Sequence, residues 1–259
     1  MTAGIYGTDD ERPSLLFSVV DAIAFWMRTP LLFWIVTLPI AGLAAGTAYV
    51  FDTHHALAEF RDHWGWDFLF ALIYSLFLDR WIKASLLDDA SPCDEVDNLR
   101  RSIVSPRFLG LATAFFLLAL AMTEFAPRLA EADIVLWSAG AALIALYLPS
   151  LSAAQPLSLR QALAAGRPVQ THLFLLIAGT IAVSVLAGIG FGRMMEFLPP
   201  GAWHGPAVAA LQQIVVCLVL AIAGHVLATM FRGATEWRAP EPDDHPYRNM
   251  GLRRRSVSR

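Results

Sequence analysis

The chain has 259 residues, of which 56% are hydrophobic and only 16% are charged, and its formal net charge is −3. Soluble globular chains carry about 25% charged residues, so this composition argues against an ordinary soluble domain. The slightly negative charge excludes the basic character that a nucleic-acid-binding protein needs. Eighteen of the 19 basic residues are arginine, a bias that, with abundant alanine, is typical of a GC-rich bacterial source.

Residues 1–13 form a polar stretch that we expect to be a mobile tail. Ser14 follows as the predicted cap of an amphipathic helix that extends to Arg28. Apolar side chains recur on one side of this helix, while Asp21 and Arg28 fall on the other. The pattern predicts a helix that lies along the surface of a membrane.

Six long apolar runs follow, and each is close to the roughly 20 residues that a helix needs to cross about 30 Å of hydrocarbon. The predicted spans are residues 31–51, 66–85, 108–126, 134–153, 173–192 and 207–231. Residues 233–259 are polar and contain three prolines, so we expect a disordered tail there. The predicted fold is therefore an all-α membrane domain over residues 14–232 with six transmembrane helices.

Short amphipathic segments precede three of the six predicted spans. Each segment ends at a proline, at Pro30, Pro106 or Pro168, and the residue before a proline disfavours the helical conformation. This arrangement predicts a degenerate repeat of one surface helix and two spans, with three surface helices in all. The alternative is that these segments occur by chance, as they do before some spans of any multi-pass protein.

Basic residues are distributed unequally between the two predicted sides of the membrane. The side that carries both termini holds 16 of the 19, and the other side holds Arg61, Arg128 and Arg193. Loops rich in Lys and Arg stay in the cytoplasm, so both termini and the three surface helices are predicted to be cytoplasmic. We therefore expect a multi-pass protein of a bacterial inner membrane.

The first predicted outer loop contains DTHHALAEFRDH, in which His55, Glu59 and His63 are four residues apart. A helix would place all three on one face, and imidazole and carboxylate are suitable ligands for Zn²⁺. However, the outer two would lie about 12 Å apart along the axis, so they need another segment or a kink to share one ion. A solvated loop is the favoured interpretation, and no cofactor is predicted.

Three charged residues, Asp79, Arg80 and Lys83, close the second predicted span. Asp79 and Lys83 are spaced as an i, i+4 pair, and the basic side chains can extend to the headgroup level. The favoured interpretation is structural anchoring, and the alternative is a site for an anionic ligand or a lipid headgroup. Arg160 and Arg167, on the third predicted surface helix, are candidates for the same kind of headgroup contact.

His225 is the only Asp, Glu, His, Lys or Arg residue within the last predicted span, about two turns before Arg232. Ionisable residues inside a membrane are functional candidates. A single histidine can also bond to a hydroxyl or a carbonyl on a neighbouring helix, and no second histidine at a suitable depth supports a haem site. Gln212 and Gln213, in the outer part of the same span, are predicted to form hydrogen bonds between helices.

The segment Leu148 to Leu175, LPSLSAAQPLSLRQALAAGRPVQTHLFL, joins the end of one predicted span to the start of the next through a short helix with small and basic residues. It resembles the corresponding part of YciC-like membrane proteins and of the related membrane domain of some glycerophosphodiester phosphodiesterases. The resemblance implies six spans and cytoplasmic termini. It implies no catalytic residues, because none belong to that membrane domain.

The sequence contains no nucleophile elbow, phosphate-binding loop, dinucleotide fingerprint or HExxH motif. We therefore predict a non-enzymatic accessory or scaffold protein that acts through helix–lipid and helix–helix contacts. Its expected partners are membrane lipids and either another protein or a second copy of the chain, not nucleic acid. The alternative is a transporter or channel for a small molecule or a lipid, and a metalloenzyme that combines the loop histidines with His225 comes third.

Overall fold

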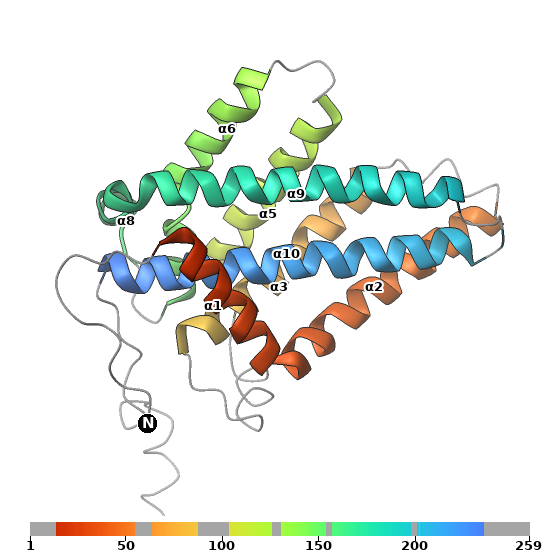
Figure 1. The fold of residues 1–259 in the computed structure, drawn as a ribbon, viewed down its shortest axis with the longest axis horizontal. Helices are drawn as coiled ribbons and strands as arrows, with labels where there is room; N and C mark the ends of the chain where they lie inside the picture. The colour runs from red at the N-terminus through yellow and green to blue at the C-terminus, as the bar shows by residue number, and fades with distance from the viewer. Residues whose placement is uncertain are drawn as a thin grey trace, which may run out of the picture.

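The computed structural model describes residues 14–54, 64–87, 104–125, 131–153, 157–197, 201 and 203–235, and every regular element in these ranges is a helix (Figure 1). The predicted N-terminal tail, the outer loop with His55, Glu59 and His63, and the surface helix expected before Pro106 lie outside the described residues. Residues 236–259 lie outside them as well. The first part of the predicted C-terminal tail is helical, because the last helix continues to Thr235.

The helices lie where the apolar runs predict them. In chain order they are α1 (Leu15–Arg28), α2 (Pro30–Thr53), α3 (Trp64–Leu87), α5 (Pro106–Phe125), α6 (Glu131–Ile144), α7 (Tyr147–Ser152), α8 (Leu159–Gly166), the 3₁₀ helix η3 (Arg167–Val169), α9 (Gln170–Phe197) and α10 (His204–Thr235). Three helical stretches are long and apolar enough to cross a membrane: α2, the stretch from Leu159 to Phe191, and α10. The described part of the chain is therefore an all-helical fold with three helices that could cross a membrane.

A single residue, Thr29, separates α1 from α2. The Ser14 hydroxyl accepts a hydrogen bond from the Phe17 N–H at 3.2 Å and so caps the start of α1. At the other end, the Thr29 N–H and hydroxyl both donate to the Phe25 carbonyl, at 3.0 Å and 2.9 Å. Pro30 then occupies the first position of α2. Its missing N–H costs nothing there, because an N–H at this position has no acceptor within the helix. The short corner fixes α1 at the end of α2.

The fourth predicted span, residues 134–153, is divided into α6 and α7 by a turn at Ala145 and Leu146. Pro149 accounts for the division, because it has no N–H for the Ala145 carbonyl four residues earlier and its ring clashes with that carbonyl. The Ala145 carbonyl instead accepts from the Leu148 N–H at 3.3 Å, which tightens the chain into a turn. Residues from Leu148 to Ala153 are buried, so this short helix lies inside the protein.

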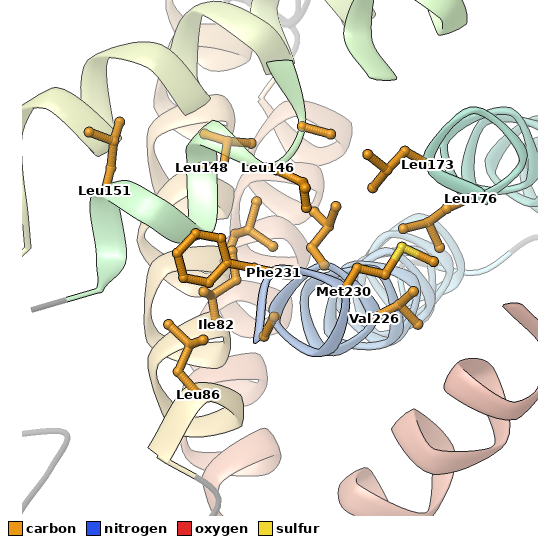
Figure 2. Close-up of a cluster of buried hydrophobic side chains, with 14 of the residues drawn as sticks. Ile82, Leu86, Leu146, Leu148, Leu151, Leu173, Leu176, Val226, Met230 and Phe231 are labelled. Atoms are coloured by element: carbon orange, nitrogen blue, oxygen red, sulfur yellow. The ribbon is translucent and has the colours of Figure 1, made fainter. Parts of the chain in front are cut away.

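Helix α10 is the centre of the bundle. It packs against α1, α2, α3, α7, α8 and α9, and Figure 1 shows it lying beside α9 and crossed by α1. Its C-terminal half contributes Val226, Met230 and Phe231 to an apolar cluster (Figure 2). The same cluster takes Ile82 and Leu86 from α3, Leu146, Leu148 and Leu151 from the α7 region, and Leu173 and Leu176 from α9. The short helices therefore close one end of the bundle around α10.

A second apolar cluster joins α1, α2, α3 and α10 and is rich in aromatic rings. Trp81 stacks on Phe77 with ring centroids 5.9 Å apart, and Phe33 meets Trp81 edge to face at 6.0 Å. Gly224 permits the close approach of α10 to α3, because a Cβ there would lie 3.0 Å from Leu78 Cδ1. These contacts align the C-terminal half of α3 with that of α10 and so position the polar side chains described next.

Candidate functional site

Asp79 is fully buried on α3 and has partners on two helices. The Lys83 ammonium, one turn later on α3, donates to Asp79 Oδ2 at 2.7 Å, as the i, i+4 spacing predicts. Ser152 is the last residue of α7, and its hydroxyl donates to Asp79 Oδ1 at 2.8 Å. Both carboxylate oxygens are thus engaged, and one of the bonds ties the short helix α7 to α3.

This buried ion pair is suited to hold structure rather than to exchange a ligand. Removing one member of a buried pair costs about 3–5 kcal/mol, because the other charge is left without compensation in a medium of low polarity. Asp79 has no exposed surface, while the Lys83 side chain keeps 17% of its own. Lys83 can therefore reach the surface while its charge neutralises Asp79.

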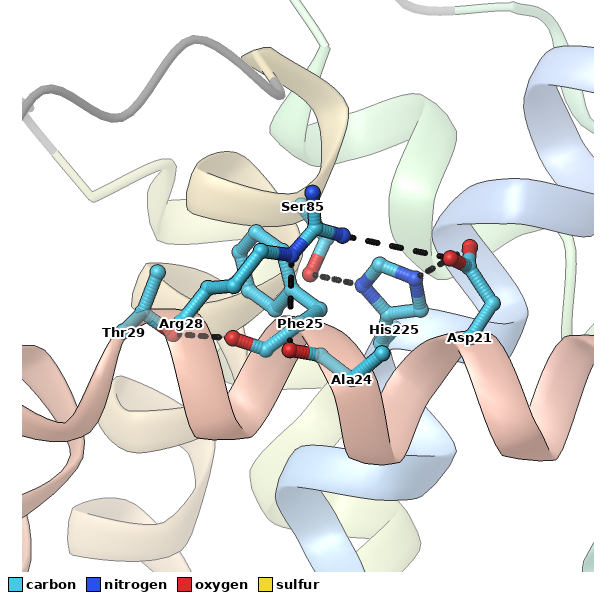
Figure 3. Close-up of polar contacts among 7 residues, drawn as sticks. All are labelled: Asp21, Ala24, Phe25, Arg28, Thr29, Ser85 and His225. Atoms are coloured by element: carbon cyan, nitrogen blue, oxygen red, sulfur yellow. Dashed lines mark hydrogen bonds and ion pairs between the residues drawn. The ribbon is translucent and has the colours of Figure 1, made fainter.

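His225 is fully buried on α10 and joins three helices (Figure 3). Its Nδ1 lies 3.1 Å from the Ser85 hydroxyl of α3, and its Nε2 lies 3.1 Å from Asp21 Oδ2 of α1. The Phe25 ring of α1 stacks on the imidazole, with centroids 4.6 Å apart and planes at 29°. At the rim of the cluster, Arg28 Nη2 lies 3.9 Å from Asp21 Oδ1.

Both ring nitrogens of His225 have a hydrogen-bond partner. With a proton on Nε2, the ring donates to the Asp21 carboxylate, and its Nδ1 can accept from the Ser85 hydroxyl. Serine, histidine and aspartate in this order resemble a hydrolase triad, but a nucleophile must be reached by its substrate. Ser85 is fully buried within α3. The arrangement therefore serves as a fastening between α1, α3 and α10.

The two predicted glutamines have different surroundings. Gln213 Oε1 accepts a hydrogen bond from the Tyr74 hydroxyl of α3, which is the interhelical bond expected of it. Gln212 is exposed on the neighbouring face of α10. A further contact between helices, which the sequence did not single out, joins the Ser75 and Thr113 hydroxyls of α3 and α5 at 3.1 Å.

The remaining predicted binding residues lie on the surface or outside the described chain. Arg160 on α8 and Arg167 on η3 are exposed, and Arg80 on α3 is half-buried. The Ser158 hydroxyl and the Gln161 side chain cap α8 reciprocally, which explains why a helix begins there. Within the described ranges, no group of three or more His, Cys, Asp or Glu side chains could hold a metal ion.

Sequence reasoning missed the partners of the two buried ionisable groups. Asp21 and Ser85 belong to the His225 cluster, and Ser152 belongs to the Asp79 cluster. In the sequence, Asp21 lies on the side of an amphipathic helix that is expected to face water. Ser85 and Ser152 lie near the ends of predicted spans, where serine is common and indicates no particular partner. The one available signal was that a deep histidine needs partners on neighbouring helices.

The fold and the buried polar clusters define a helical protein with three helices that could cross a membrane. Comparisons with protein-family models, with curated proteins and with solved structures return no significant match for this chain. The resemblance to YciC-like membrane proteins therefore stays a prediction, and the function is inferred from the geometry of the chain itself.

Proposed function

We propose that this chain is a non-enzymatic accessory or scaffold subunit of a bacterial inner membrane, which acts through lipid and helix–helix contacts. One observation carries the proposal: Asp79 and His225 are both buried, and each bonds to a short helix of the bundle. Asp79 bonds to Ser152 of α7, and His225 bonds to Asp21 of α1. Polar groups used in this way bond to neighbouring helices and hold the short helices in fixed positions.

The proposed topology has six spans and places both termini in the cytoplasm. The apolar helices α2 and α10, and the helical stretch Leu159–Phe191 that includes most of α9, are long enough to cross a membrane. α3, α5 and the broken pair α6–α7 occupy the other three predicted spans. The excess of basic residues near both termini supports the orientation. The same arrangement is what the resemblance to YciC-like proteins implies.

Helix α9 presents an apolar surface on the outside of the bundle. α9 packs against α10 and α6. Leu175, Val183, Leu186 and Ile189 of α9 are all exposed, Leu186 at 66%. Because lipid tails are as apolar as leucine, association of such a surface depends on close packing with a complementary helix.

The test of an accessory role is stoichiometry in the native lipid environment. The tagged full chain would be extracted in polymer-bounded lipid particles, and the mass of each particle measured. We expect a constant number of copies, or a second subunit at a constant ratio, at low and high expression. Particles that hold one copy of the chain alone at every expression level would contradict the proposal.

Transport is the second candidate, because α7, the short helix that follows the break at Ala145 and Leu146, bonds through Ser152 to buried Asp79. Broken helices next to buried polar groups are a recurrent feature of transporters. Vesicles containing the protein and a fluorescent phospholipid would be treated with dithionite, which bleaches the outer leaflet. Lipid transport predicts complete bleaching that Asp79→Asn slows and the matched change Asp67→Asn does not. A scaffold predicts bleaching of about half the dye in every case, as in protein-free vesicles.

A further inference from the structure

The outward side of α1 carries a stripe of large apolar side chains. Leu16, Phe17, Val20, Ile23 and Met27 are 75%, 60%, 56%, 40% and 69% exposed. They fall on one side of the helix, since residues three to four apart are neighbours on its surface. An apolar surface of this kind marks a site of interaction with another molecule or with a membrane.

The opposite side of α1 is docked on the bundle. Ser18, Ala22 and Phe25 are buried, and Asp21 bonds to His225 of α10. The sequence pattern places Ser18 and Asp21 on the side expected to face water, but in the structure that side faces the protein. The apolar stripe is therefore turned outward, and the bundle does not cover it.

The position of α1 identifies what covers the stripe. Thr29 alone joins α1 to α2, a helix that is long and apolar enough to cross a membrane. α1 crosses α10 at His225, six residues before Phe231 at the end of the predicted span, which corresponds to about 9 Å along the axis (Figure 1). Amphipathic helices in membranes bury their apolar side about 5–10 Å into the boundary between headgroups and acyl chains. α1 lies at the corresponding level of the bundle.

A basic side chain beside the stripe selects the kind of lipid. Arg28 is the last residue of α1 and lies on the Asp21 side of the helix, 3.9 Å from Asp21 Oδ1, with its side chain 63% exposed. Asp21 already shares its other oxygen with His225. An exposed pair at this distance contributes little to stability. The Arg28 guanidinium is therefore able to bind a lipid phosphate beside acyl chains that contact Val20 and Met27.

We propose that the outward side of α1, together with Arg28 beside it, is a binding surface for anionic phospholipid in the adjoining leaflet. The Asp21–His225–Ser85 contact holds this surface at a fixed depth. The inference rests on the membrane topology of the proposed function and adds its lipid partner. A partner protein would need complementary packing for the same stripe, and the experiment below distinguishes that case.

The experiment places an environment-sensitive dye on the stripe of the full chain. The sequence has two cysteines, Cys93 and Cys217. Cys93 is replaced by Ser so that it does not react with the dye, and Cys217 can stay because it is fully buried. Val20→Cys carries the dye on the stripe, and Gly233→Cys carries it at an exposed control position with open space around it. Each protein is reconstituted into phosphatidylcholine vesicles with or without phosphatidylglycerol, and the dye is quenched by doxyl lipids or by iodide.

We expect doxyl lipids to quench the dye at residue 20 and iodide to quench it at residue 233. Phosphatidylglycerol should strengthen the doxyl quenching at residue 20. Arg28→Gln should weaken that preference about fivefold, the effect of one basic residue at an anionic surface. The matched control Arg193→Gln also removes one positive charge, but near the C-terminal end of α9. It should leave the preference for phosphatidylglycerol at residue 20 unchanged. Because Val20, Arg28 and Arg193 are all exposed, these variants retain the packed core.

Three results would overturn the inference. Iodide quenching at residue 20 would place the stripe in water. Protection from both quenchers would show that protein, from a second copy of the chain, covers it. Equal behaviour with and without phosphatidylglycerol would remove the anionic preference. None of these results alters the copy number per lipid particle, which tests the accessory role separately.

Discussion

Asp79 and Lys83 show how a single residue pair can be read in two ways until its surroundings are known. The i, i+4 spacing allows either a surface pair that anchors a span or an entry point for an anion. In the structure Asp79 is fully buried and bonds to both Lys83 and Ser152, which favours the structural interpretation. The charges of Asp79 and Lys83 therefore contribute to the packing between α3 and α7.

Removing one charge of this pair is expected to cost more than removing both. Lys83→Met should lower the free energy of unfolding by about 3–5 kcal/mol, because it strands a buried carboxylate. The double change Asp79→Leu with Lys83→Met should recover much of that loss. Unfolding in mixed micelles with increasing dodecyl sulfate would measure both. A double variant less stable than Lys83→Met would contradict this account of the pair.

Gly224 is expected to tolerate no large side chain. A Cβ there would lie 3.0 Å from Leu78 Cδ1, so Gly224→Leu forces α10 away from α3 and should cost about 1–3 kcal/mol. Gly233 lies on the same helix with nothing within 4 Å of its added Cβ. Gly233→Leu should therefore be neutral or slightly stabilising in the same unfolding measurement. Equal losses would show that the contact with α3 is unimportant.

Helix α1 illustrates what the sequence could and could not predict at the level of an element. Its start at Ser14 and its end before Pro30 follow from capping and proline chemistry, and the structure agrees with both. Its orientation did not follow, because a polar side can face water or a polar partner. That partner, His225, lies 204 positions away in the chain, and one sequence carries no information about that pairing.

Two other elements make the same point. The Leu159–Gly166 helix could be predicted from its capping residues and small amphipathic pattern, and it is present. The division of the fourth apolar run at Ala145 and Leu146 was hidden by uniform hydrophobicity, although Pro149 was visible. Proline is tolerated in many membrane helices when neighbours satisfy the freed carbonyl. Whether it kinks or breaks a helix therefore depends on packing around it.

The docking of α1 is expected to depend on His225. His225→Leu removes a hydrogen bond to a charged group, a loss of roughly 1.5–3 kcal/mol, so α1 should open from α10 more often. The readout is maleimide labelling of Ser18→Cys, which lies on the buried side of α1. The labelling rate should rise by about tenfold or more. Ser75→Ala removes a hydroxyl contact between α3 and α5 and should leave the rate unchanged. Equal labelling rates in the two variants would show that His225 does not hold α1 against α10.

At the scale of the whole molecule, the end of the bundle that the short helices close also contains the hydrogen-bonded side chains of Asp79 and His225. α1, α7 and α8 gather around the C-terminal halves of α3 and α10, and both buried ionisable groups lie at that end. The proposed orientation places this end at the cytoplasmic side, where the basic residues are concentrated. A bundle with one closed, rigid end and apolar helices extending from it is suited to present fixed surfaces within a membrane.

The orientation itself is testable with two exposed glycines at opposite ends of α10. Gly201 precedes the helix and Gly233 lies near its end, and an added Cβ at either position meets nothing within 4 Å. In a Cys93→Ser background, a membrane-impermeant maleimide added to intact spheroplasts should label Gly201→Cys, because the predicted outer side holds few basic residues. It should label Gly233→Cys only after permeabilisation, since both termini are proposed to be cytoplasmic. The reverse pattern would invert the topology, and labelling of both from outside would show that α10 does not cross the membrane.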